Sequence, residues 1–153
     1  MADDEPGRIV PVHDRFGYLL KHARERLAAL SAEALQRFNL SGRELAVLTV
    51  LAAGEPPSQL EAAQRLSIDR TTMVALIDGL EAKDLVKRGP DPADRRRNIV
   101  VLTTAGRKAL IGASRATDEA ERAFLAPLAG NDGDRLRELL RAVISEGEVN
   151  GKG

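Results

Sequence analysis

The sequence predicts a mainly helical protein that carries one small β-hairpin. Alanine and leucine are the commonest apolar residues, and aromatic residues make up only 3% of the chain, a composition that favours helices. Apolar residues recur at helical spacing through most of the chain, whereas β-branched residues gather in residues 98–102, shortly after a break rich in proline and glycine. We therefore expect one domain, residues 1–153, with the element order α-α-α-α-β-β-α-α.

The first two helices are expected at residues 15–38 and from residue 42 onward. The longer one would carry a broad apolar band along one face. Ser41 and Glu44 form the pattern of a capping box, in which two side chains bond backbone N–H groups at the start of a helix. This pattern predicts a second helix that continues through Leu51.

The third and fourth helices form a helix-turn-helix. Ser58 and Glu61 make another capping box directly after two prolines, and Ser67 begins a tight turn that ends at Asp69, the expected N-cap of the fourth helix. One face of that helix is apolar and would face the core, while the start of the opposite face is small and polar. The apolar stripe consists of Met73, Leu76, Ile77 and Leu80.

A β-hairpin with a cationic tip is expected next. Residues 86–88 form a short first strand, residues 89–92 break it, and residues 98–102 form the second strand. Three consecutive arginines, residues 95–97, lie between the strands. A helix-turn-helix followed by such a hairpin is typical of proteins that place one probe in each groove of a DNA duplex.

Two long helices complete the chain, one from residue 103 to a stop at Pro127 and one that starts near Asp132 or Asp134. Together with the first helix they carry more apolar surface than the small lobe at residues 58–102 can cover. Residues 13–38 and 103–147 are therefore expected to be dimerisation helices that pack against a second copy of the chain.

The charge distribution favours a polyanionic partner. The formal net charge is zero, but residues 58–108 hold ten basic and seven acidic side chains, whereas both flanking parts have an acidic excess. This pattern would confine phosphate contacts to one face and make binding sensitive to salt.

Residues that the chain lacks exclude several other classes of protein. It has no cysteine, so a disulfide framework and a thiol switch are excluded. Its longest apolar stretch is too short to span a bilayer, and the N-terminus lacks a signal core, so a cytoplasmic protein without membrane contact is expected. We expect no metal, no cofactor and no enzymatic activity, because neither a ligand cluster, a glycine-rich phosphate loop nor a nucleophile–base pair is apparent.

Three segments resemble the MarR family of winged-helix repressors, and the similarity extends over nearly the whole chain. They are Asp-Arg-Thr-Thr at residues 69–72, Leu-Glu-Ala-Lys-Asp-Leu-Val at residues 80–86, and the hairpin with its following Leu-Thr-x-x-Gly at residues 94–106. The Asp-x-Arg wing that runs into Leu-Thr-x-x-Gly is the most specific part. Ser67 departs from the pattern, since many relatives have glycine in that turn. The resemblance implies a winged helix-turn-helix whose terminal helices interleave in a homodimer.

The fourth helix is the candidate recognition helix. Its first residues could reach bases or phosphates, because an arginine can bond guanine and a helix N-terminus attracts phosphate. Small apolar side chains one turn later could contact thymine methyl groups. The alternative is an ordinary solvated helix face. The candidates on this helix are Arg70, Thr71, Thr72, Val74 and Ala75.

The hairpin supplies the remaining DNA-binding candidates. Arg96 matches the wing arginine of the family, which implies entry into the minor groove with Asp94 holding its side chain; the alternative is a loose charged turn. Arg95 and Arg97 are expected to contact phosphates. Four weaker candidates have other possible roles, as edge-strand cations or as a helix cap: Lys87, Arg88, Ser58 and Gln59.

The resemblance also implies a small aromatic or phenolic effector that releases DNA. His13, Tyr18 and His22 on the first long helix could line its pocket, although ordinary surface or packing roles are the simpler interpretation. The sequence thus predicts a homodimeric, sequence-specific repressor that binds a near-palindromic operator in double-stranded DNA. The alternative is a winged-helix dimer that binds nucleic acid without sequence preference or docks on protein.

Overall fold

The computed structural model describes residues 9–149, and it confirms the expected order of elements. A short 3-10 turn, η1, precedes six α-helices and one hairpin. The elements are η1 (Val12–Asp14), α1 (Phe16–Gln36), α2 (Gly42–Ala52), α3 (Gln59–Arg65), α4 (Arg70–Ala82), β1 (Val86–Pro90), β2 (Asn98–Leu102), α5 (Thr104–Leu125) and α6 (Asp132–Val149).

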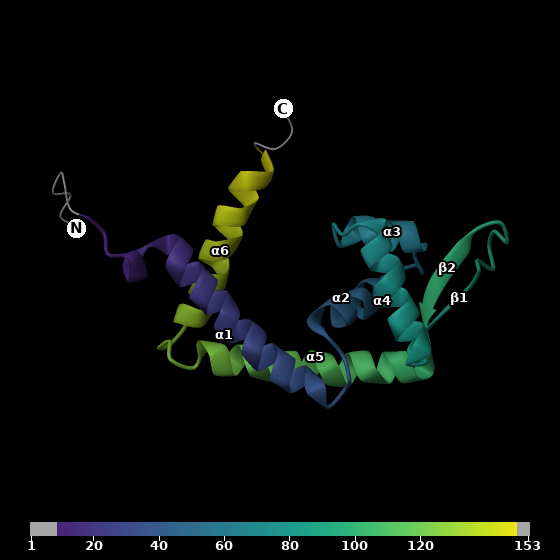
Figure 1. Cartoon of the computed structure of the whole chain (residues 1–153), viewed down its shortest axis with the longest axis horizontal. Coiled ribbons are helices and arrows are strands. Elements are labelled where there is room, and N and C mark those ends of the chain that lie inside the picture. The colour runs from purple at the N-terminus through teal and green to yellow at the C-terminus, as the bar shows by residue number, and fades with distance from the viewer. Residues whose placement is uncertain (1–8, 150–153) are drawn as a thin grey trace.

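The elements form a lobe and an arm (Figure 1). The lobe contains α2, α3, α4 and the hairpin, which projects away from the rest of the molecule. The arm contains α1 and α6, and α5 runs along the base beneath both parts. The DNA-binding candidates therefore lie at one end of the molecule, and α1 and α6 of the expected dimerisation helices lie at the other, while α5 runs beneath both.

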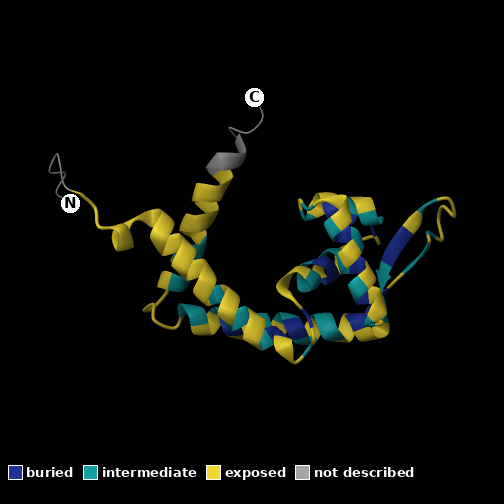
Figure 2. Ribbon diagram, in the orientation of Figure 1, coloured by how far each residue is buried: buried dark blue, intermediate teal, exposed yellow. Residues whose placement is uncertain are grey.

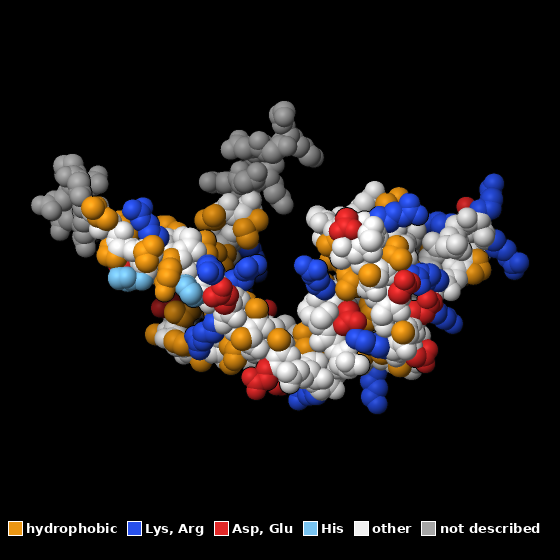
Figure 3. Space-filling view, in the orientation of Figure 1, with side chains coloured by type: hydrophobic (Ala, Val, Ile, Leu, Met, Phe, Trp, Pro, Cys, Tyr) orange, Lys and Arg blue, Asp and Glu red, His pale blue; other side chains and the backbone are white. Residues whose placement is uncertain are grey.

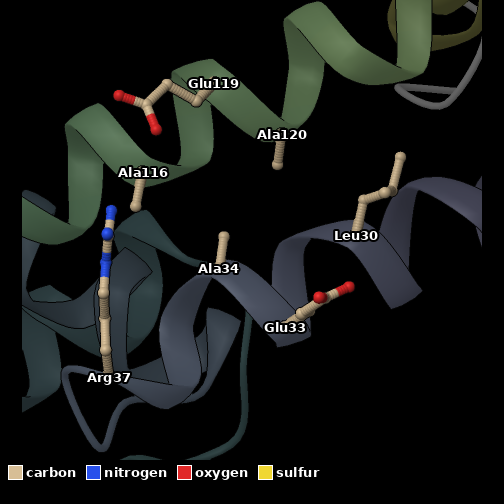
Figure 4. A pocket seen from close by; sticks show the side chains of 7 residues that line it. All are labelled: Leu30, Glu33, Ala34, Arg37, Ala116, Glu119 and Ala120. Atoms are coloured by element: carbon tan, nitrogen blue, oxygen red, sulfur yellow. The ribbon is translucent and has the colours of Figure 1, made fainter.

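Small side chains let α1 and α5 pack closely. Ala34 of α1 faces Ala116 and Ala120 of α5 (Figure 4), and both α5 alanines are buried. Glu33, Arg37 and Glu119 border the open groove, about 360 Å³ in volume, that remains between the helices. Alanine buries no long side chain and allows two helix backbones to approach.

The hydrophobic core lies in the lobe, between α2, α4 and the base of the hairpin (Figure 2). Three of the four residues in the predicted apolar stripe of α4, namely Met73, Ile77 and Leu80, are fully buried, and Leu76 is partly buried. They pack with Val47 and other residues of one cluster. A change that shrinks one of these side chains would leave a cavity directly behind the exposed face of α4.

The hairpin differs from the prediction in the length of its first strand. The break was expected at residues 89–92, but β1 continues through Gly89 and Pro90, which pairs with Asn98. Proline lacks a backbone N–H, and it is tolerated here because β1 is the edge strand and Pro90 lies at its end. On the other side, Val100 N–H donates to the carbonyl of Pro57 at 3.0 Å and fixes β2 to the start of α3.

The base of the hairpin meets the start of α5 at a close backbone contact. A Cβ atom on Gly106 would lie 1.9 Å from the carbonyl oxygen of Leu85, so only glycine fits. Thr103 caps α5 by accepting from Gly106 N–H at 2.9 Å. Of the residues that the structure describes, none belongs to a helix long and apolar enough to cross a membrane.

Candidate nucleic-acid interface

Local side-chain bonds build the helix-turn-helix, as the sequence predicted. Ser58 and Glu61 form the capping box of α3, in which Ser58 N–H donates to Glu61 Oε2 at 2.7 Å and Glu61 N–H donates to Ser58 Oγ at 3.2 Å. Asp69 caps α4 by accepting from Thr72 N–H at 2.8 Å and from the Thr72 hydroxyl at 2.6 Å. The bond from the Thr72 hydroxyl holds the pKa of Asp69 below its usual value, and the bond from Thr72 N–H lowers it further.

The first turn of α4 presents a polar, exposed surface. Arg70, Thr71 and Ala75 are exposed, and Val74 is partly buried. Thr72 is partly buried as well, and its hydroxyl is already bonded to Asp69. Arg70 and Thr71 are therefore the side chains at this end of α4 with the most freedom to meet a base or a phosphate.

The tip of the wing holds one arginine in an extended, exposed position. The side chain of Arg96 is 95% exposed, and its Nε lies 3.5 Å from Asp94 Oδ1. The same carboxylate oxygen accepts from Arg96 N–H at 3.1 Å, so the expected ion pair is present and the backbone reinforces it. Arg95 is also exposed, and cationic side chains project from the outer end of the hairpin (Figure 3). Such a tip is narrow enough and positive enough for the minor groove.

Arg97 differs from the other two wing arginines because carboxylates hold it against the lobe. Its Nη2 bonds Glu61 of the α3 capping box, and its Nη1 bonds Asp91 at 3.2 Å. The bond from Ser58 and then the bond from Arg97 lower the pKa of Glu61, and the bond to Glu61 raises the pKa of Arg97. The expectation that Arg97 contacts phosphate stays a prediction, and in this structure two carboxylates pair with its guanidinium.

Arg88 is paired in the same way, and its expected role in DNA binding stays a prediction. Its guanidinium bonds Asp78 and Glu81 of α4, each at 2.5 Å, and donates to Gln59 Oε1 at 3.2 Å. This contact engages the amide oxygen of Gln59, and Ser58 serves as a helix cap. Lys87, the neighbouring strand residue, is exposed.

These carboxylate partners were not predicted from the sequence. Asp78 and Glu81 are three positions apart on α4, which places them on one side of the helix, and this spacing could have suggested a shared cation. The cation itself comes from β1 and could not be assigned from spacing alone. The exposed cations that remain at the interface include Arg70, Lys87, Arg95 and Arg96.

The predicted effector residues lie on the surface of the arm rather than around one cavity. His13 pairs with Asp14 at 3.7 Å, and His22 Nδ1 lies 3.1 Å from a carboxylate oxygen of Glu25. The rings of Tyr18 and His22 are stacked at a tilt, with centroids 4.1 Å apart. His22 borders an apolar groove against the end of α5, and His13 lies one turn before α1. Their role in ligand binding stays a prediction.

Comparison with known proteins identifies the family to which this lobe and arm belong. A model described as the MarR family matches residues 38–97. The transcriptional repressor NicR of Pseudomonas putida is 31% identical over 145 residues, which cover 92% of this chain and 89% of NicR. The chain belongs to the MarR family. It is accordingly a DNA-binding winged-helix transcriptional regulator, a function other than catalysis.

Solved structures support the MarR fold over most of the chain. A probable transcriptional regulator from Pseudomonas aeruginosa is 32% identical, with a TM-score of 0.77 over 87% of this chain and 99% of that one. The repressor CouR bound to a 23-mer DNA duplex is 29% identical, with a TM-score of 0.75 over 90% of this chain and 99% of CouR. CouR from Rhodococcus jostii RHA1 bound to p-coumaroyl-CoA is 26% identical, with a TM-score of 0.75 over 88% of this chain and 95% of that one.

Proposed function

We propose that this MarR-family chain is a homodimeric, sequence-specific repressor that a small aromatic acid releases from its operator. The observation that carries the proposal is that one lobe presents two exposed probes, the start of α4 and the tip of the wing. Arg70 and Thr71 begin α4, and Arg96 is held out at the wing tip by Asp94. A helix in the major groove and an arginine in the adjacent minor groove together read both the bases and the shape of a duplex.

The arm supports the homodimer because it leaves large apolar side chains exposed. On η1 and α1 these include Val12, Phe16 and Leu20, with exposed fractions of 71%, 84% and 54%. On α6 they include Val143 and Ile144, at 73% and 63%. Burying each such side chain stabilises an interface by roughly 1.5–3 kcal/mol, which favours a second copy of the chain packed against both helices.

A two-fold dimer would determine the form of the operator. Its two α4 helices would enter successive major grooves, roughly 34 Å apart, so the two half-sites would be inverted repeats. The wings would then reach the flanking minor grooves.

The experiment is to substitute Arg96 with alanine and measure binding to a duplex selected by the wild-type protein from a random-sequence pool. We expect operator affinity to fall about 10- to 100-fold, because each dimer loses two minor-groove arginines. Circular dichroism and sedimentation should show unchanged helix content and an unchanged dimer, because the side chain is 95% exposed. Arg115→Ala, which removes an exposed cation from α5, serves as the matched control. Wild-type affinity in Arg96→Ala would contradict the role of the wing.

We propose as the effector site an apolar cavity between α2 and the helix-turn-helix, in place of the surface around His13, Tyr18 and His22. The cavity has a volume of about 240 Å³ and is lined by Gly42, Arg43, Ala46, Leu66, Ile68 and Leu76. Arg43 is its only charged lining residue, so the cavity suits one aromatic ring with an acidic group. The larger groove between α1 and α5 suits it less, because Glu33 and Glu119 border it. The complex of CouR with p-coumaroyl-CoA supports an aromatic effector.

A titration with 4-hydroxybenzoate tests this site. We expect the compound to weaken operator binding by the wild-type protein, and Arg43→Ala to raise the required concentration about tenfold, since a charged hydrogen bond is lost. Arg37→Ala, in the groove between α1 and α5, is the control and should respond as the wild type does. If Arg37→Ala loses the response and Arg43→Ala keeps it, the site is wrongly assigned.

A further inference from the structure

We propose that Arg88 and Arg97 are positioning residues, which fix the wing relative to the recognition helix and do not contact DNA themselves. We call these two arginines, with their carboxylate and amide partners, the wing clasps. The inference rests on the proposed function, because it concerns how the two DNA probes are held at a fixed separation.

The first wing clasp joins three elements through one side chain. Arg88 lies on β1, Asp78 and Glu81 lie on α4, and Gln59 is the first residue of α3. The guanidinium bonds both carboxylates at 2.5 Å and the amide oxygen at 3.2 Å, and Arg88 N–H adds a bond of 3.1 Å to Glu81. A planar guanidinium with several donors fixes the directions of its partners, which an ammonium group cannot do.

The second wing clasp holds the other side of the hairpin. Arg97 immediately precedes β2, Glu61 lies on α3 and Asp91 immediately follows β1. Arg97 bonds both carboxylates, and Asp91 N–H donates to the Arg97 carbonyl at 2.8 Å. Each strand is thus tied to the helix-turn-helix close to the point where the hairpin leaves the lobe. Beyond these ties, Arg95 and Arg96 continue into the exposed tip.

The partners of Arg88 lie where a DNA-binding protein would be expected to avoid acidic groups. Asp78 is exposed on α4, with 60% of its side chain accessible, and Glu81 is 41% accessible. Unpaired carboxylates this close to a phosphate backbone would repel it. Their pairing with Arg88 removes that repulsion, and their location is explained if they anchor the wing.

The proposal and simple electrostatics predict opposite results for Asp78→Asn. Removing a negative charge and freeing Arg88 should tighten DNA binding if electrostatics alone decides. If the clasp positions the wing, affinity for the selected duplex should instead fall roughly 5- to 50-fold. Arg88→Met should lose at least as much affinity, because both carboxylates then also lose their partner. Tighter or unchanged binding by Asp78→Asn would overturn the proposal.

A measurement without DNA keeps the test independent of the proposed function. The chain has no cysteine, so Ala93→Cys in the wing and Ala53→Cys after α2, both exposed, can carry two nitroxide labels. Labelled protein is diluted with unlabelled protein so that only distances within one chain are measured. We expect Arg88→Met to broaden or shift the distance distribution relative to the wild type, and Arg115→Ala to leave it unchanged. An unchanged distance distribution in Arg88→Met would contradict the positioning role of Arg88, even if DNA binding were confirmed. Wild-type protein that does not bind DNA would refute the proposed function alone.

Discussion

At the scale of single residues, three non-glycine side chains take a left-handed backbone to end a helix. Asn39, Ser67 and Asp84 have φ values of 52°, 51° and 59°. In each case the backbone N–H of the next residue donates to the carbonyl oxygen of the residue five positions before it. Ile68 N–H, for example, donates to the carbonyl of Ala63 at 3.1 Å. Asparagine and aspartate tolerate this conformation better than serine does. Ser67, where the family resemblance led us to look for glycine, therefore keeps the turn at some energetic cost.

Replacing Ser67 with glycine should stabilise the protein. A left-handed backbone costs a non-glycine residue about 1–2 kcal/mol, and glycine would remove this cost. The greater freedom of glycine in the unfolded chain offsets part of the gain in stability. We expect the free energy of unfolding, measured by urea denaturation, to rise by about 0.5–1 kcal/mol. The matched control is Ser114→Gly inside α5, where the same substitution should lower it by about 0.5–1 kcal/mol. Equal losses in both variants would show that the backbone at Ser67 is not strained.

At the scale of elements, the sequence was most informative where the stabilising contacts are local. The capping residues of α2, α3 and α4 were all predicted, because a cap and its partner are three residues apart and leave a readable pattern. The ion pair between Asp94 and Arg96 is also local, and it was expected from the resemblance to the MarR family. The helices themselves followed from their apolar periodicity.

Contacts between segments that are distant in the sequence could not be predicted in this way. Arg88 and Arg97 appear in the sequence as two more free cations, since their partners on α3 lie 29 and 36 positions away. The continuation of β1 through Pro90 was missed because local turn propensity favours a break, and the pairing with β2 overrides it. The close approach of Gly106 to Leu85 is likewise a contact between elements.

At the scale of the whole molecule, the chain has no net charge, but charged and apolar side chains are distributed unevenly between its two ends. Cations gather at the wing and at the start of α4, while exposed apolar side chains gather on α1 and α6. α5 runs beneath both parts and packs against α1 in the arm and α2 in the lobe. A ligand in the cavity between α2 and the helix-turn-helix would shift the lobe against α5, and we expect an effector to move the two lobes of a dimer relative to each other in this way.

We propose that two copies of the chain bind one operator with paired helices and wings. Hydroxyl-radical footprinting on a duplex selected by the wild-type protein is the sharpest test of this arrangement. We predict protection that is symmetric about one centre, with two major-groove patches roughly one helical turn apart and flanking minor-groove protection that disappears in Arg96→Ala. Uniform protection along the duplex, or a single patch without symmetry, would contradict the claim.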